Sequence, residues 1–369
     1  MVITAALVII LSAFNGIEKM IEKMYSEFDS DITIVAKDRK RFQTNELNWK
    51  LLEKNPDIRR FSKAIEEMVV LRHEKKWVNA TLIGVEPNYL QSIEINEHLW
   101  AGNAQFQEGK LAYGIIGVGL TDKLQLAFSK GGSSESILLY VPKRNVKIGM
   151  GRSPFFVERV LIAGAMNYNR EVNEDKLLWP LEKVQQLLND DQNLTHVYIE
   201  VKEDTKKNTV KTQLQQQLGS TFEVKTNFEK NELIFQTSQS EKMVVIVILI
   251  FVFVLASFNL VASLTMLYIE KESNLKTLLS IGLSEKDIFR LFFYEGLLIS
   301  GIGIGLGLSL GYLLCWLQIQ FHLFLIPGPN TPFPMRISLG DFLTIFLSVS
   351  SLSVLFSYIP TYFLVRKRK

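Results

Sequence analysis

The sequence has few of the residues that build disulfide frameworks or metal sites. Its single cysteine, Cys315, lies inside an apolar run, so a disulfide framework is excluded and any polar domain must be stabilised by a packed core. Its histidines are isolated and lack metal-ligand spacing, so we expect neither a metal nor another cofactor. These histidines are His73, His98, His196 and His322.

Motifs for catalysis and nucleotide binding are missing as well. The chain contains no G-x-x-x-x-G-K-[ST] phosphate loop and no G-x-S-x-G nucleophile turn. The net charge is only +3, and basic residues do not alternate with aromatic ones, which argues against nucleic-acid binding. We therefore expect this chain to have no enzymatic activity of its own.

Long apolar runs are present, and they are separated from the charged residues. Residues 243–269, 297–317 and 342–364 contain no Asp, Glu, Lys or Arg, and each has the roughly 20 residues needed to cross a bilayer. The basic cluster 366–369 follows the last run directly. By the positive-inside rule it places the C-terminus and the segment 270–296 in the cytoplasm, and the domain before residue 242 outside.

The N-terminal residues predict a further span. Residues 1–14 are apolar but too short to cross a membrane, and they lack the charged start of a signal peptide. We expect the chain as given to begin inside a first transmembrane helix, without its cytoplasmic half. Apolar residues at helical spacing continue this helix as a stalk beyond the membrane, and residues 229–242 lead into the second span in the same way.

The charged segment 270–290 predicts a short helix, a break, and a second helix that starts at about Ser284 and runs into the membrane. Leu275, Leu278 and Leu279 have the spacing of one apolar helix face. Ile281 to Leu283 interrupt the pattern, and Ser284 with an acidic residue three positions later indicates a new helix start. The pattern alone leaves two alternatives open, an ordinary loop and a docking element for a partner.

Residues 256–311 resemble the core of the FtsX-like permeases of ABC transporters, most closely the LolC and LolE type of the lipoprotein-releasing system. The resemblance rests on Ala-Ser-Phe-Asn at 256–259, Ile-Glu-Lys at 269–271, the Ile-Gly turn at 281–282 and Glu-Gly before a glycine-rich span. It implies that 270–290 is a coupling helix that inserts into a separate, LolD-like ABC ATPase subunit. The resemblance also implies that the ATPase subunit pushes on this segment when it binds ATP. The residues expected to receive this push are Leu275, Lys276, Leu279, Gly282 and Leu283.

The polar domain has an α/β signature. A strand at 31–37, a helix and turn at 48–61 and strands at 66–73 and 77–85 come first, and a strand, helix and strand at 196–202, 208–219 and 221–226 come last. Between them lie further strands and a helix at 179–189. The glycine-rich loop 146–156, with Phe155 and Phe156, offers two alternatives: contact with a carrier, or packing on the domain, which we favour.

The predicted fold is an α-helical membrane protein with four spans, the first apparently truncated, and a large α/β extracytoplasmic domain. The resemblance implies that this domain has porter-like and inserted Sabre-like subdomains. In chain order we expect a partial first span and stalk at 1–24, the porter-like subdomain at 25–85 and 191–228, the Sabre-like insertion at 86–190, a stalk and second span at 229–269, the coupling helix at 270–290, the third span at 291–318, an external loop at 319–341, the fourth span at 342–365 and a cytoplasmic tail at 366–369.

Two further groups of residues have predicted roles. Gly303, Gly307 and Gly311 form a row that lets another helix approach closely. The resemblance implies lipid contacts on the first two helices, where Met and Phe suit a variable acyl surface, although simple bundle packing is an equal alternative. These residues are Phe14, Ile17, Met20, Met24, Phe251, Leu255 and Phe258.

The resemblance implies a function in the bacterial inner membrane. The chain would pair with a second permease copy or a sister subunit, extract lipoproteins from the outer leaflet and pass them to a LolA-like periplasmic carrier by mechanotransmission. Two alternatives remain open. One is a MacB-like exporter of drugs or peptides, and the other is an FtsX-like signalling subunit that controls cell-wall hydrolases.

Overall fold

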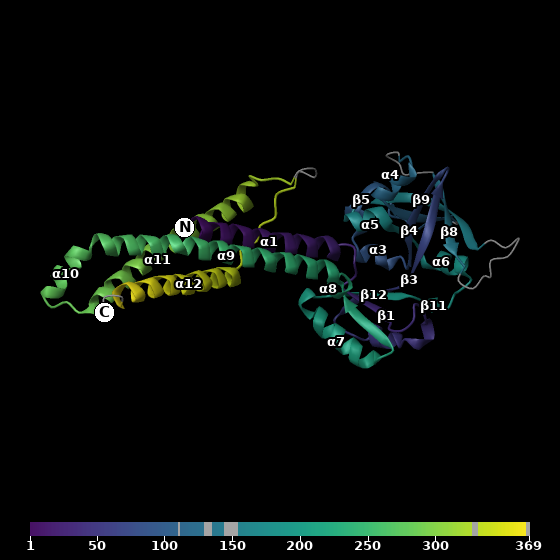
Figure 1. The fold of residues 1–369 in the computed structure, drawn as a ribbon. Helices are drawn as coiled ribbons and strands as arrows, with labels where there is room; N and C mark the ends of the chain where they lie inside the picture. The colour runs from purple at the N-terminus through teal and green to yellow at the C-terminus, as the bar shows by residue number, and fades with distance from the viewer. Residues whose placement is uncertain (110, 129–134, 144–153, 327–330, 367–369) are drawn as a thin grey trace. The chain divides into compact units, whose positions relative to one another are not determined.

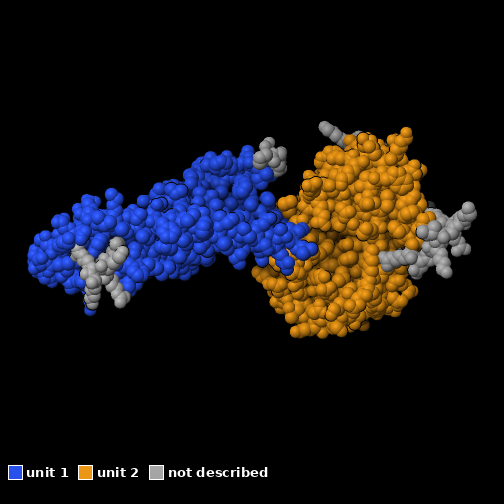
Figure 2. Space-filling model, in the orientation of Figure 1, with its two compact units in different colours: residues 1–21, 233–369 blue, residues 22–232 orange. Residues whose placement is uncertain are grey.

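The computed structural model describes residues 1–109, 111–128, 135–143, 154–326 and 331–366 (Figure 1). The chain divides into two compact units, which Figure 2 colours separately: residues 1–21 with 233–369, and residues 22–232. The first unit is helical, and the second is built around a β-sheet.

Four helices of the described residues are long and apolar enough to cross a membrane. α9 continues without a break from polar residues into its apolar run, and its 39 residues measure about 58 Å, which exceeds a bilayer core of about 30 Å. The helices are α1 (Val2–Ser26), α9 (Glu232–Glu270), α11 (Glu285–Phe321) and α12 (Leu339–Arg366), and the shorter α10 (Glu272–Ser280) lies between α9 and α11.

The helical unit has an apolar core to which all four long helices contribute. Buried side chains from each helix meet in one cluster. They are Leu7, Val8 and Leu11 of α1, Leu249 of α9, Ile304 and Leu308 of α11, and Ile345 and Val349 of α12. Apolar side chains elsewhere on these helices are widely exposed. Because lipid is as apolar as these side chains, such exposure is expected of membrane helices.

The second unit contains a large sheet in which six strands close into a ring. The long strand β3 pairs with β4 and β8, and the ring continues through β10, β7 and β9 back to β8. These strands are β3 (Ile58–His73), β4 (Lys76–Val85), β7 (Leu111–Gly117), β8 (Ser136–Pro142), β9 (Phe155–Met166) and β10 (Lys176–Pro180).

The first half of β3 carries a second group of strands. It pairs with β12 (His196–Val201), which is followed in the sheet by β1 (Ile32–Ala36) and β13 (Phe222–Thr226). The shorter strands are β2 (Phe42–Gln43), β5 (Leu99–Gly102), β6 (Gln107–Glu108) and β11 (Asn193–Leu194). The helices of this unit are α2 (Trp49–Glu53), α3 (Asn88–Ser92), α4 (Val118–Leu124), α5 (Arg170–Asp175), α6 (Leu181–Leu188), α7 (Lys207–Leu218) and α8 (Asn227–Lys230).

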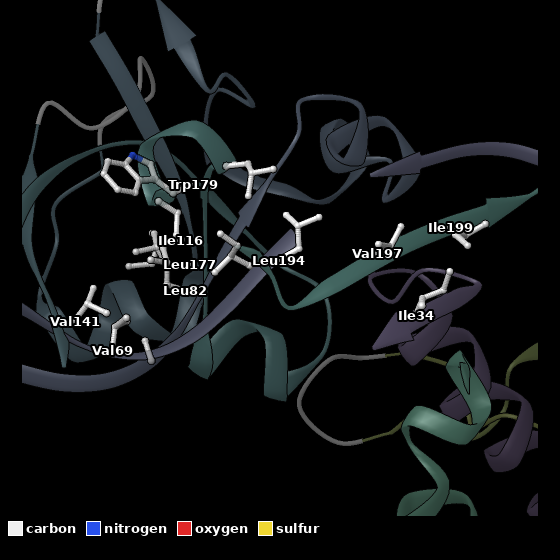
Figure 3. Close-up of a cluster of buried hydrophobic side chains, with 14 of the residues drawn as sticks. Ile34, Val69, Leu82, Ile116, Val141, Leu177, Trp179, Leu194, Val197 and Ile199 are labelled. Carbon is white, nitrogen blue, oxygen red and sulfur yellow. The ribbon is translucent and has the colours of Figure 1, made fainter. Parts of the chain in front are cut away.

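One continuous apolar core runs through both groups of strands (Figure 3). Leu82, Ile116 and Leu177 from the ring are buried in the same cluster as Ile34 and Val197 from the other strands. β3 also passes through both groups. The boundary between porter-like and Sabre-like subdomains at residue 85 therefore remains a prediction.

The expected strands and the helix that ends before Gly219 are confirmed, with two corrections. Residues 58–61, expected in a helix and turn, begin β3 because they pair with β12. Trp179 and Pro180, expected in a helix, end β10 because they pair with β4. Most of the loop 146–156 lies outside the described residues; Phe155 and Phe156 begin β9, and Phe156 packs against the core.

Candidate functional site

The turn between α10 and α11 has defined geometry at both helix ends. The N–H of Leu283 donates to the carbonyl of Leu278 at 3.1 Å, and the N–H of Gly282 donates to Leu279 at 3.0 Å, which is the Schellman pattern. Gly282 has a φ of +106°, a conformation that side-chain-bearing residues rarely adopt. Ser284 then caps α11 through a reciprocal capping box with Asp287.

The apolar face of α10 packs against the helices of its own chain. Leu275 is 2% exposed, in a cluster with Tyr268, Ile288 and Phe292, and Leu279 is half-buried against the same cluster. These two predicted coupling residues therefore anchor α10, and Leu275 is not available to a partner in this structure.

The exposed surface of α10 and its turn consists of other residues. Leu283 is 40% exposed and Ile281 is 79% exposed, with Leu278 also exposed. Lys276 is exposed and lies 3.2 Å from Glu272 on the same helix. The predicted contacts include Lys276, Gly282 and Leu283 on this surface, and they do not include the exposed Leu278 and Ile281.

The predicted acyl contacts divide into two sets. Phe251, Leu255 and Phe258 are all exposed on one face of α9, and the Phe258 ring is 6.2 Å from that of Phe356 on α12. Phe14, Ile17 and Met20 on α1 are half-buried, and Met24 lies in the second compact unit, where its carbonyl accepts a hydrogen bond from Asn169. Three of the predicted residues therefore share one exposed apolar face of α9.

The glycine row of α11 lies where α1 crosses it. A Cβ at Gly307 would be 2.6 Å from the Cβ of Thr4, and one at Gly311 would be 2.8 Å from the Cβ of Val8. The contact at Gly303 is looser, at 3.5 Å from the Met1 nitrogen. The distances at Gly307 and Gly311 are shorter than real Cβ atoms show. Only glycine therefore permits this approach of α1 at those two positions.

We expect Gly311→Leu to destabilise the helical unit by about 1–3 kcal/mol, because the added side chain would overpack the contact with Val8. Thermal unfolding of the purified protein in detergent measures the effect. Gly305→Leu is the matched control, because a Cβ there would meet no atom within 4 Å. Equal melting temperatures for the two variants would contradict the packing role.

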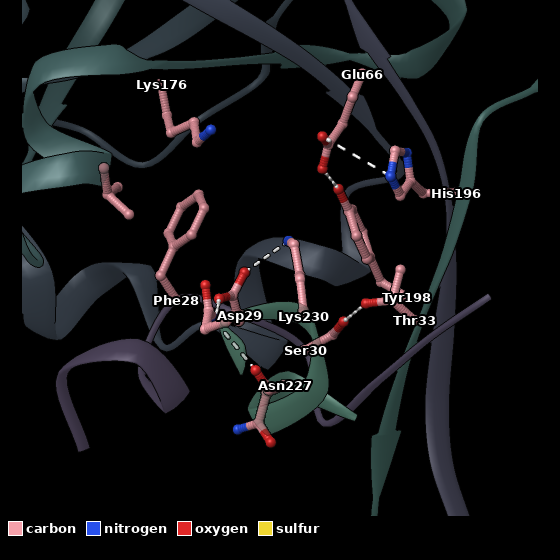
Figure 4. Close-up of polar contacts among 12 residues, drawn as sticks. Phe28, Asp29, Ser30, Thr33, Glu66, Lys176, His196, Tyr198, Asn227 and Lys230 are labelled. Atoms are coloured by element: carbon pink, nitrogen blue, oxygen red, sulfur yellow. Dashed lines mark hydrogen bonds and ion pairs between the residues drawn. The ribbon is translucent and has the colours of Figure 1, made fainter. Parts of the chain in front are cut away.

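In the second unit, a polar joint connects Asp29, which follows α1 in the chain, with Lys230 and Asn231, which precede α9 (Figure 4). Lys230 Nζ lies 2.7 Å from Asp29 Oδ1. Asn231 Nδ2 donates to the other carboxylate oxygen of Asp29 at 2.7 Å. The Tyr89 hydroxyl donates to the carbonyl of Phe28 at 3.0 Å. The two chain segments that lead to the membrane helices are therefore tied to one place.

The sheet contributes a second charged group to this joint. Glu66 of β3 accepts a hydrogen bond from the Tyr198 hydroxyl and lies 3.9 Å from Nε2 of His196. Lys230 lies over the Tyr198 ring at 5.7 Å from its centroid. The sequence reasoning missed this joint, because its members are distant in the chain and only the sheet pairing brings them together.

Burial and neighbouring charges set the ionisation of the joint. Burial acts to raise the pKa of Glu66, but the charges of His196 and Lys230 and the hydrogen bond from Tyr198 outweigh it and lower that pKa to about 2. Burial also lowers the pKa of His196, so Lys230 and Lys176 are the cations that act on Glu66 at neutral pH. Burial opposes the charge of Lys230, but Asp29 and Glu66 raise its pKa overall.

Comparison with protein families accounts for nearly the whole chain. The model of the MacB-like periplasmic core domain matches residues 1–217, and that of the FtsX-like permease C-terminal matches residues 246–368. The chain belongs to the MacB-like and FtsX-like permease family. As a permease of this ABC-transporter type, it is a transmembrane subunit that works with an ATPase subunit.

Curated relatives of this permease include two proteins named lipoprotein-releasing system transmembrane protein LolC. That of Buchnera aphidicola is 24% identical over 367 residues, covering 97% of this chain and 87% of the relative. That of Xylella fastidiosa is 23% identical over 219 residues, covering 56% of this chain and 52% of the relative.

Solved structures similar to the permease include the periplasmic region of MacB from Actinobacillus actinomycetemcomitans. It is 12% identical, covers 58% of this chain and 97% of that one, and has a TM-score of 0.40. The extracellular domain of the transporter YknZ from Gram-positive bacteria is 12% identical, covers 53% of this chain and 99% of that one, and has a TM-score of 0.38.

Proposed function

We propose that this permease releases lipoproteins from the outer leaflet of a bacterial inner membrane and passes them to a LolA-like periplasmic carrier. The LolC relative that aligns over 97% of the chain is the observation that carries the proposal. The exposed face of Phe251, Leu255 and Phe258 on α9 supports it, because an acyl chain requires an apolar surface that the protein itself leaves uncovered.

In this proposal the movement begins at the turn between α10 and α11. A LolD-like ATPase would contact Ile281, Gly282 and Leu283 in this turn. When the ATPase closes on ATP, the turn and α10 would move, and with them α9 and α11, to which they are connected in the chain. The polar joint of Asp29 and Lys230 would then transmit that movement, because it holds the ends of both segments that lead to α1 and α9. The β-rich unit would face the periplasm, and a second permease chain would complete the complex.

Depletion of the permease in its native bacterium tests the proposal. We expect outer-membrane lipoproteins to accumulate in the inner membrane, because their removal from it would stop. Fractionation of the two membranes followed by immunoblotting of several lipoproteins measures this, with an integral outer-membrane barrel protein as the control. Normal lipoprotein sorting after complete depletion would contradict the proposal and favour export of another substrate or signalling.

A further inference from the structure

A cluster of polar side chains joins three apolar helices of the helical unit. Lys242 is the last charged residue before the apolar run of α9, and Asp341 is the last before that of α12. Lys242 Nζ donates to Oδ1 of Asn15 on α1 at 2.6 Å and lies 3.7 Å from Oε2 of Glu18. The Asn15 amide nitrogen donates to Oδ2 of Asp341.

The Asn15 amide is satisfied on both sides in this arrangement. Its oxygen faces a cation and its nitrogen faces a carboxylate, so each end meets the partner its polarity requires. Glu18 is one turn further along the same face of α1 and gives Lys242 a second acceptor. Because polar groups beside lipid are costly when unpaired, the cluster strongly favours one relative position of α1 and α9.

The other contacts of α1 are of a different kind. α11 meets it at glycines, and the loop before α12 meets it through its backbone: the Arg336 N–H donates to the Ser12 carbonyl at 2.9 Å, and Gly16 lies against Pro334. These contacts depend on close packing. Lys242 instead makes a hydrogen bond to Asn15 and an ion pair with Glu18, and both can be exchanged for contacts with water or lipid headgroups when the helices separate.

We propose that Lys242 and Asn15 form a latch that closes the seam between α1 and α9 at the end nearest the polar residues of α9. The inference rests on the proposed function, because an outer-leaflet lipid substrate must pass between membrane helices to reach the interior of the complex. Lys242 and Asn15 position the two helices relative to each other. They hold the seam closed when it is empty and separate when a substrate enters.

A buried cysteine reporter tests the latch in the full-length protein. Leu249 is 8% exposed and lies two helical turns after Lys242 on the same face of α9. In a Cys315→Ala background, we expect a cysteine at Leu249 to react with a maleimide at least five times faster when Lys242→Met or Asn15→Leu removes the latch. Lys242→Arg, which keeps the charge and the donors, should leave the slow rate unchanged.

Two controls separate local opening from general loosening. Leu264 is 1% exposed near the other end of α9, and a cysteine there should react slowly in every variant. Glu241→Gln, next to Lys242 on an exposed position, should leave labelling at Leu249 unchanged. Unchanged labelling at Leu249 in both latch variants, or an equal rise at Leu264, would overturn the proposal.

The labelling experiment does not depend on the outcome of the lipoprotein-sorting assay. Labelling reports on the seam whether or not lipoproteins are the substrate, so normal lipoprotein sorting after depletion would contradict the proposed function and leave the labelling result intact. If the seam opens and the function holds, Lys242→Met should also change how rapidly a photoreactive lipoprotein crosslinks to α9. Lys242→Arg should restore the original crosslinking rate.

Discussion

Leu283→Asp should release the partner ATPase from the complex, with a loss of affinity of at least tenfold. Leu283 is 40% exposed directly after Gly282, and the Schellman turn holds it outward beside Ile281. A carboxylate there would be buried against the partner without a counter-ion, which costs far more than the lost apolar contact. Copurification of the tagged permease with its ATPase, followed by quantification of both subunits, measures the effect.

The matched control is Leu283→Met, which keeps an apolar side chain of similar volume and should retain the ATPase. Leu279 is less suitable for the test. It is half-buried against Tyr268 and Phe292, so a charge there would disturb the packing of α10 as well as any partner. If Leu283→Asp copurifies with the ATPase as well as the unmodified chain does, the turn is not the contact point.

Glu66→Gln should lower the free energy of unfolding of the β-rich unit at pH 7 by about 2–3 kcal/mol. The pKa of Glu66 falls from its ordinary value of 4.5 to about 2 in the fold, which corresponds to about 3 kcal/mol at most. Removing the carboxylate leaves Lys230 and the Tyr198 hydroxyl without one of their partners. Tryptophan fluorescence during denaturation reports on this unit, which contains Trp49, Trp77, Trp100 and Trp179.

The ionisation of Glu66 also sets the direction in which the stability of the β-rich unit changes with pH. Because its folded pKa is lowered, its stabilisation is complete above pH 4.5 and is lost as the pH falls from 4.5 towards 2. The pKa of His196 is also lowered, so acidification below about pH 6.5 destabilises the fold through that residue too. Glu66→Gln should remove the steeper loss below pH 4.5 and leave the loss near pH 6 in place.

Glu53→Gln is the control for this experiment, because Glu53 is exposed on α2 and should change neither the stability nor its pH profile. If Glu66→Gln unfolds like the unmodified chain at every pH, the carboxylate contributes no net stability to the joint.

The helical unit could be predicted in more detail than the β-rich unit. Apolar runs and the signals at Gly282 and Ser284 are local, so the long helices and the turn after α10 followed from the sequence. The pattern of Leu275 and Leu279 showed an apolar face, but periodicity does not tell whether that face meets the same chain or a partner. In the structure it meets Ile288 of the same chain.

The joint and the closed ring of strands depend on pairings between distant residues. β8 pairs with both β3 and β9, and no local property of residues 136–142 specifies those neighbours. Asp29 and Lys230 meet only because β1 and β13 are adjacent in the sheet. Contacts of this kind follow from topology, which a single sequence specifies only weakly.

In the proposed function, this chain transmits force from a partner ATPase to release a lipoprotein. Its most direct test reconstitutes the permease, its ATPase and a fluorescent triacylated lipoprotein in vesicles, and measures transfer of the lipoprotein to a soluble carrier. We expect transfer that requires ATP, the ATPase and an intact Leu283, with no ATP hydrolysis by the permease alone. Equal transfer without ATP, or ATP-driven cycling of the complex that never releases the lipoprotein, would contradict this function.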